Sequence, residues 1–251
     1  MYEDYRVIKL AKNNIQEFIV KKSLNRLKLF MDGYKLGIYC VANFSNQGKE
    51  KEEELELAKI KSKEYDEFVT YIENKLGRDF HTVSISLFNH LDDYYKDKKI
   101  SFDRFLEFYD EFLEQNKEVS EVKIEKYQKA YYMLLGKSSN EQLFRNFYTL
   151  LSSMKKRIYM YIGMDSHLEH LKIYFEGIIF SINELSQTGI IFNPNFELFI
   201  RDKFDFKGNE DFFKIIKYMY ESEEEALFKF FEHLEEFEKK FGELLIVPNK
   251  K

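Results

Sequence analysis

The chain has 251 residues, of which 44% are hydrophobic and 33% charged, and its net charge at pH 7 is −5. This apolar fraction is ordinary for a globular protein and excludes an intrinsically disordered one. The mild acidity, with both signs of charge interspersed, speaks against a dedicated nucleic-acid binder. Cys40 is the single cysteine, which excludes an internal disulfide and a cysteine zinc cluster.

The sequence predicts no membrane span and no signal peptide. Its longest stretch without a charged residue, Leu36–Gly48, is shorter than the ~18–20 apolar residues that a spanning helix needs. The first residues, Met1-Tyr2-Glu3-Asp4, lack the basic region and apolar core of a signal peptide. We therefore expect a cytoplasmic protein that does not enter a membrane.

The composition is biased toward residues with AT-rich codons. There are 26 Phe and 18 Tyr, and 32 Lys stand against 7 Arg. The simplest interpretation is a low-GC bacterium, or a phage or mobile element that lives in one, and we prefer it to a functional interpretation of the aromatic residues.

Three runs carry β-branched and aromatic residues and are candidate strands: Tyr5–Leu10, Tyr34–Phe44 and Glu243–Val247. Pattern alone does not separate a short strand from a buried helix. A small sheet that joins the two termini is therefore the alternative to an all-helical chain.

Apolar residues at helical spacing predict three helices in the first half. Residues 65–76 form the first, with Gly77 as its stop. The second follows Ser101, a favourable N-cap, and the third runs from about residue 119 to 135 and closes at Gly136.

The region from 139 to 187 gives the clearest prediction. Ser139 with Gln142, and Ser166 with Glu169, form two capping boxes, each followed by a long apolar stripe. The first helix ends at a glycine only three residues before the second capping box. So short a connection predicts two adjacent antiparallel helices, an αα-hairpin.

The C-terminal region predicts two short helices and one long one. The short helices fall near Phe196–Arg201 and Glu210–Tyr220, after a break at Asn193–Asn195. Ser222 with Glu225 opens the long helix. Its apolar stripe consists of Leu227, Phe230, Phe231, Leu234, Phe237 and Phe241.

With two Pro and ten Gly, the chain has few helix breakers. We predict a mainly α, multi-helix bundle with the αα-hairpin (139–187) at its centre and, as an addition, a small terminal β element. Residues 1–251 are expected to form one helical domain, and residues 1–48 are the candidate for a distinct N-terminal α/β subregion.

Polar side chains line one side of the second helix of the hairpin. At ~100° per residue, His170, Tyr174, Ser181 and Glu184 share a stripe, with His167 at its edge. Apolar residues flank this polar seam on both sides, so its side chains need partners. These four residues are binding candidates, and His167, His170 and Tyr174 are the catalytic candidates.

His167 and His170, at i and i+3, are also the metal-ligand candidates, with Glu176 or Glu184 nearby. Glu169 is already explained by the capping box, and the Glu-x-x-His pattern of di-iron helices is absent from the sequence. We expect no cofactor, and a divalent metal at the two histidines is the alternative.

Other catalytic and binding motifs are missing. The sequence contains no Gly-x-Ser-x-Gly and no glycine-rich phosphate loop. Lys155, Lys156 and Arg157 form a small basic cluster, which is more typical of a solvated helix face than of a nucleic-acid site.

The last helix is acidic, with eight Glu between Glu221 and Glu238. The simple interpretation is a surface helix packed through its apolar stripe. Phe228 lies outside that stripe among the acids, which suggests a contact with a basic partner.

The leading hypothesis is a cytosolic protein-protein interaction or regulatory module of a low-GC bacterium or its phage, resembling immunity, defence or counter-defence proteins in mode of action. Its partner would be another protein, not nucleic acid. The alternative is an enzyme with a polar, metal-binding pocket around His167 and His170, and a third hypothesis is a self-associating structural protein.

Overall fold

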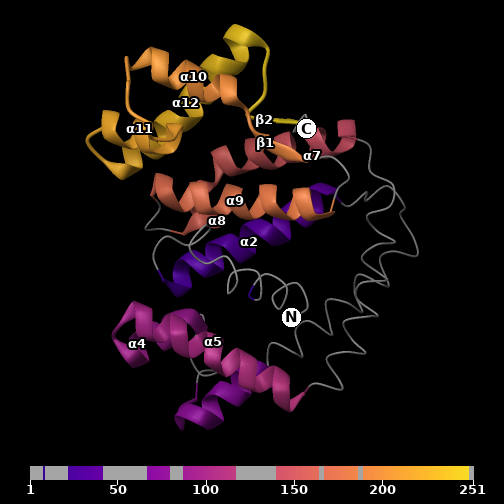
Figure 1. Cartoon of the computed structure of the whole chain (residues 1–251), viewed down its shortest axis with the longest axis vertical. Helices are drawn as coiled ribbons and strands as arrows, with labels where there is room; N and C mark the ends of the chain where they lie inside the picture. The colour runs from indigo at the N-terminus through magenta and orange to yellow at the C-terminus, as the bar shows by residue number, and fades with distance from the viewer. Residues whose placement is uncertain are drawn as a thin grey trace. The chain divides into compact units, whose positions relative to one another are not determined.

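A computed structural model describes Ile8 and residues 22–41, 67–79, 87–116, 140–163, 167–185 and 189–248. Over these residues the protein is mainly helical, with one two-stranded sheet (Figure 1), and the predicted fold class is confirmed. No helix of this described part is long and apolar enough to cross a membrane.

The chain divides into two compact units. The first consists of Met1–Met31 and Ala42–Lys137, and the second of Asp32–Val41 and Ser138–Lys251. Helix α2 (Leu24–Val41) contributes residues to both.

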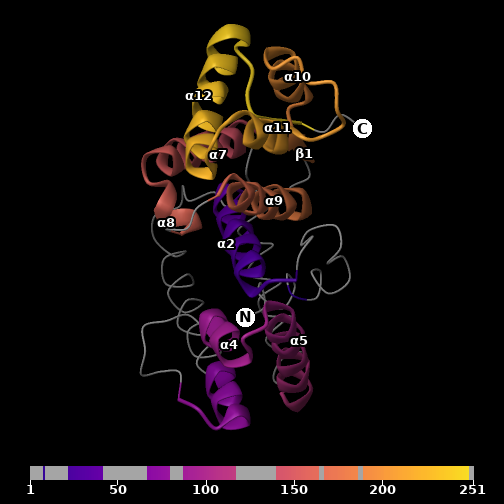
Figure 2. The ribbon, with the colours of Figure 1, turned by 90° about the vertical axis from the view of Figure 1, so that its left-hand side faces the viewer.

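In the first unit, α4 (Leu87–Tyr95) packs beside α5 (Lys98–Gln115), as Figure 2 shows. The N-cap of α5 is Asp97, whose Oδ1 accepts from the backbone N–H groups of Lys99 and Ile100 at 2.8 and 2.9 Å. The prediction of Ser101 as the cap was therefore wrong. Ser101 lies inside the helix and is fully buried, and its hydroxyl bonds to the carboxylate of Asp92.

Residues 67–76 form the helix predicted there, and Gly77 ends it with a φ of 63°. Glycine adopts such a conformation readily because it has no Cβ. Phe68 packs its ring against Phe105, Tyr109 and Phe112 of α5, at centroid distances of 5.8, 5.2 and 5.2 Å. The helix predicted over 119–135 lies outside the described residues.

In the second unit, the strand prediction for Tyr34–Phe44 was wrong as far as the structure describes it, because residues up to Val41 belong to α2. Gly33, Tyr34, Gly37 and Cys40 are its buried positions here, and they recur every three or four residues, which is the helical period. Ile8, within the candidate strand Tyr5–Leu10, is also helical, and the rest of that run lies outside the described residues.

The predicted hairpin forms with one difference. Its first helix is in two pieces, α7 (Asn140–Lys156) and α8 (Ile158–Ile162), which are followed by α9 (Leu168–Leu185). Side-chain hydroxyls of Thr149 and Ser153 bond back to the carbonyls four residues earlier, at 2.9 Å each. Such back-bonding competes with the backbone ladder and bends helices, which accounts for a break just after it.

Helices α7 and α9 run in opposite directions in Figure 1, and the rings of Phe147 and Phe175 lie 6.2 Å apart between them. Gly163, with a φ of 87°, ends α8 as predicted. Ser139 and Ser166, the first residues of the two capping boxes, lie outside the described residues.

Three further helices form one group in Figure 2: α10 (Pro194–Lys203), α11 (Phe212–Met219) and α12 (Glu223–Phe241). All three agree with the predicted C-terminal helices. Ser222 caps α12 by accepting the N–H of Glu225 at 3.0 Å, as the capping box predicts.

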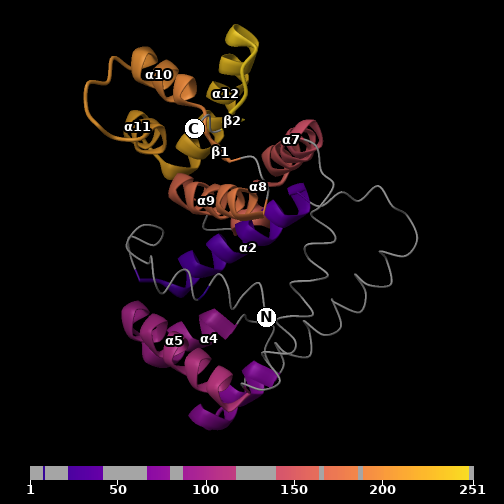
Figure 3. The same ribbon diagram turned by 45° about the vertical axis from the view of Figure 1, so that its right-hand side comes forward.

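The sheet joins β1 (Ile190–Phe192) to β2 (Ile246–Pro248), which pair antiparallel with Ile191 opposite Val247 (Figure 3). The C-terminal run is thus a strand in its last part. Its partner is β1, within the same unit; of the N-terminal run that the alternative paired with it, only Ile8 is described, and it is helical. Buried Asn193 holds the pair by donating its side-chain amide to the carbonyl of Leu244 at 2.8 Å.

Aromatic rings fill the core of the second unit. Phe175 of α9 contacts Phe147, Phe192, Phe213 and Phe230, with centroid distances of 6.0–6.5 Å. All but Phe192 are buried, and each buried phenyl contributes about 2–3 kcal/mol of burial free energy. Much of the unusual phenylalanine content therefore serves packing.

Candidate functional site

Helix α9 lies beside α2 (Figure 3). A Cβ added to Gly33 would overlap the backbone carbonyl of Tyr174, and one added to Gly37 would overlap the Ser181 hydroxyl, so part of the polar seam meets α2 at close range. Ser181 is fully buried and donates to the carbonyl of Ile178 at 3.0 Å. This end of the seam is a tight helix crossing.

Two other seam residues, Tyr174 and Glu184, also lie at this crossing. Glu184 accepts a hydrogen bond from the Tyr34 hydroxyl at 2.6 Å. Tyr174 is only 2% exposed, and burial, with a smaller contribution from the charge of Asp32, raises the pKa of its phenol. Tyr174 therefore stays protonated at neutral pH and is poorly suited to act as a base.

The two histidines stand at the opposite end of α9. His167 is exposed and precedes the helix, and its ring centroid lies 5.2 Å from that of His170. Within the described part of the chain, no group of three or more His, Cys, Asp or Glu side chains could hold a metal ion. Eleven residues of helix, about 16 Å, separate His170 from Ser181, so the structure does not bring the predicted binding residues into one pocket.

Cys40 is buried, and this burial raises the pKa of its thiol to about 12. The thiolate, which is the reactive form, is therefore scarce at neutral pH.

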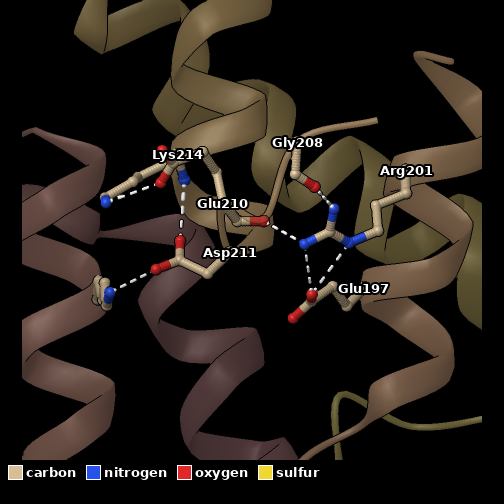
Figure 4. Close-up of polar contacts among 7 residues, drawn as sticks. Glu197, Arg201, Gly208, Glu210, Asp211 and Lys214 are labelled. Carbon is tan, nitrogen blue, oxygen red and sulfur yellow. Dashed lines mark hydrogen bonds and ion pairs between the residues drawn. The ribbon is translucent and has the colours of Figure 1, made fainter. Parts of the chain in front are cut away.

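A polar cluster that sequence reasoning missed surrounds Arg201 on α10 (Figure 4). Its guanidinium binds the carboxylate of Glu197 at 2.9–3.0 Å and donates to the backbone carbonyls of Gly208 and Glu210. Only the i,i+4 spacing of Glu197 and Arg201 was visible in the sequence. The contacts tie the loop after α10 to that helix, so the cluster has a structural role.

Asp211 extends this cluster by holding two helices. One carboxylate oxygen accepts the backbone N–H of Lys214 at 3.0 Å and caps α11, and the other accepts from Lys172 of α9 at 2.6 Å. These bonds fix α11 against α9.

His233 of α12 is the most enclosed histidine of the described residues, with 4% of its surface exposed. Its Nε2 lies 2.7 Å from the hydroxyl of Tyr220, and the ring of Phe204 stands edge-on at 5.4 Å. Burial, helped by the nearby Lys203, lowers the pKa of His233 to about 4. At neutral pH the ring is uncharged.

The first unit contains an open hollow of about 420 Å³, lined by Lys75, Glu111, Glu114 and Gln115. Lys75 is paired with Glu111 at 2.8 Å, and Glu111 also accepts from the hydroxyl of Tyr71 at 2.6 Å. Lys75 and Glu111 thus neutralise each other inside the hollow.

An aromatic pair, of which Phe228 is the exposed member, links α8 to α12. Phe228 is 43% exposed, and its ring centroid lies 6.4 Å from that of Tyr159. The Tyr159 hydroxyl donates to Glu224 at 2.7 Å, while neighbouring Met160 is 75% exposed. We call Tyr159, Met160, Glu224, Glu225 and Phe228 the Phe228 surface.

Three glutamates lie within one helical turn of Phe228 on α12. Glu224, Glu225 and Glu232 occupy positions i−4, i−3 and i+4, which are the helical neighbours of Phe228. Glu232 is paired with Lys229 at 2.7 Å. Among the described residues, Glu224 and Glu225 form no ion pair.

Lysines neutralise other glutamates of the same helix. Glu223 is paired with Lys217, Glu236 with Lys203, and Glu235 with Lys155 of the predicted basic cluster. Among the described residues, Glu221, Glu224, Glu225 and Glu238 form no ion pair, and two of these four lie one turn before Phe228.

No known protein family, curated protein or solved structure matches the chain.

Proposed function

We propose that this protein is an interaction module that binds a partner protein through the Phe228 surface. The observation that carries the proposal is the exposed phenyl of Phe228 in contact with Tyr159. Phe228 lies outside the buried apolar stripe through which α12 packs. Exposed aromatic side chains are typical of protein interfaces.

The helix that presents this surface is firmly held. Phe230 and Phe237 of α12 are buried and contact Phe196 of α10 at 6.1 and 5.2 Å. Because this packing fixes the backbone under Phe228, little conformational entropy is lost on binding, which favours affinity.

The biological setting that we propose is cytoplasmic, in a low-GC bacterium or its phage, with a regulatory, immunity-like or counter-defence role. The bias toward amino acids with AT-rich codons supports a low-GC source organism. The lone, buried Cys40 is compatible with a reducing compartment.

Affinity capture with a matched control tests the proposal. The wild type, Phe228→Asp and Leu198→Asp are each used as bait in a lysate of a low-GC host. Leu198 is 56% exposed on α10, so its substitution adds the same charge at another exposed apolar position. We expect a protein that the wild type and Leu198→Asp retain and Phe228→Asp loses. Equal capture by all three baits would exclude the Phe228 surface as the binding site.

A further inference from the structure

We infer that the partner presents a basic segment whose arginine or lysine sits on the Phe228 ring between Glu224 and Glu225. This inference rests on the proposed function and names the chemistry of the partner. It depends on the arrangement of charge around the ring, described next.

The ring and the two carboxylates form a complementary site for a guanidinium group. A cation over an aromatic face is attracted by the ring quadrupole, and a carboxylate beside it can accept the N–H groups. Tyr159 donates its hydroxyl to Oε1 of Glu224, which holds this carboxylate on the Tyr159 side of Phe228. Arginine fits better than lysine because its planar group stacks and donates at the same time.

The other end of α12 shows the same contact made within the chain. Phe241 is 47% exposed, nearly the same as Phe228, and the ammonium of Lys240 lies 5.1 Å from its ring centroid. Among the cation–ring contacts of the described residues, none involves Phe228. The ring of Phe241 thus contacts a cation of its own chain. The ring of Phe228, which lies near Glu224 and Glu225, has no such contact among the described residues and is open to a cation from a partner.

Lys229, which follows Phe228 in the chain, and Lys155 of α7 are paired with other glutamates. Lys229 is bound to Glu232 at 2.7 Å, and Lys155 is bound to Glu235. Neither pair uses Glu224 or Glu225, so these two carboxylates favour a basic partner over an acidic or neutral one.

Calorimetry of a synthetic amphipathic peptide of leucine and arginine, binding to the 251-residue chain, tests the inference. Two variants remove the site: Phe228→Leu, which keeps an apolar side chain, and Glu224→Gln/Glu225→Gln, which keeps a capping-box residue at position 225. Asp93→Asn/Asp202→Asn removes two exposed carboxylates on α4 and α10 and is the matched control for net charge.

We expect both site variants to weaken peptide binding about tenfold or more, and the control to leave it nearly unchanged. Equal weakening by the control would mean unspecific attraction to net charge and would overturn the inference. If the glutamine variant does not fold, Phe228→Leu decides alone. Absence of peptide binding, with partner capture still dependent on Phe228, would reject the basic partner and leave the proposed function standing.

Discussion

At the residue scale, His233 illustrates how neighbours set the chemistry of a titratable group. The hydroxyl of Tyr220 and the ring of Phe204 enclose the imidazole, while Lys203 and Glu236 face it from α10 and α12. Glu232 and Lys229 of α12 complete the charges near it. The neutral ring can accept the Tyr220 hydrogen at Nε2, and a protonated ring cannot.

This environment predicts an acid-sensitive stability. The pKa of His233 is about 4 in the folded protein, against an ordinary value of about 6.5 when unfolded. Between these values the unfolded state binds more protons, so the free energy of unfolding falls as the pH falls from about 6.5 to 4. The full loss is on the order of 3 kcal/mol.

Urea unfolding of the wild type and His233→Gln across this pH range measures the effect. Carboxylates titrate in both proteins, so only the difference between the two curves reports on His233. We expect the wild type to lose its advantage over the variant as the pH falls. Parallel curves would mean that the histidine is not held neutral by the fold.

At the element scale, the crossing of α2 and α9 depends on small residues. Gly33 and Gly37 lie one turn apart on α2, and the backbone of α9 occupies the space that a side chain at either position would need. The sequence pattern identified the polar seam but not the element that covers it. Nothing in the local sequence of α9 encodes the position of glycines about 140 residues away in the chain.

Gly37→Ala is therefore expected to destabilise the protein, although alanine is the better helix former by about 1 kcal/mol. The added methyl would overlap Ser181 and the carbonyl of Ile178. Overpacking of this kind costs about 1–3 kcal/mol, so we expect a net loss of about 1–2 kcal/mol. Thermal unfolding measures it, with exposed Ser152→Ala on α7 as a control. A gain in stability would show that the crossing has room to relax.

The errors in the predicted elements have two physical origins. The run Tyr34–Phe44 has strand-like composition, yet its described part is helical because its buried face matches α9 at the helical period, so a tertiary contact outweighed a local preference. The α5 helix begins earlier than predicted because Asp97, as favourable an N-cap as Ser101, accepts the N–H groups of Lys99 and Ile100.

At the scale of the whole molecule, the two leading hypotheses make different predictions about mass. We expect native mass spectrometry of protein purified without chelator to give the mass of the bare chain. His167 and His170 share no site with a third metal ligand within the described residues, and two imidazoles alone bind zinc weakly.

The double variant His167→Ala/His170→Ala is the control for that measurement. Bound zinc or iron in the wild type that disappears in this variant would place the enzyme hypothesis ahead of the interaction module. Unchanged mass and unchanged partner capture in the variant would agree with the interaction module.

The sequence by itself determined the helices from 194 to 241, the cap at Ser222 and the position of Phe228 outside the buried stripe. These features depend on hydrogen bonds and periodicity within three or four residues, which a single sequence contains. Only the tertiary structure decided that β2 pairs with β1, that α2 lies against Tyr174 and Ser181 of the polar seam, and that lysines pair with four glutamates of α12 but not with Glu224 and Glu225. Those outcomes depend on contacts between residues far apart in the chain. A local sequence pattern carries no information about which distant segment packs against it.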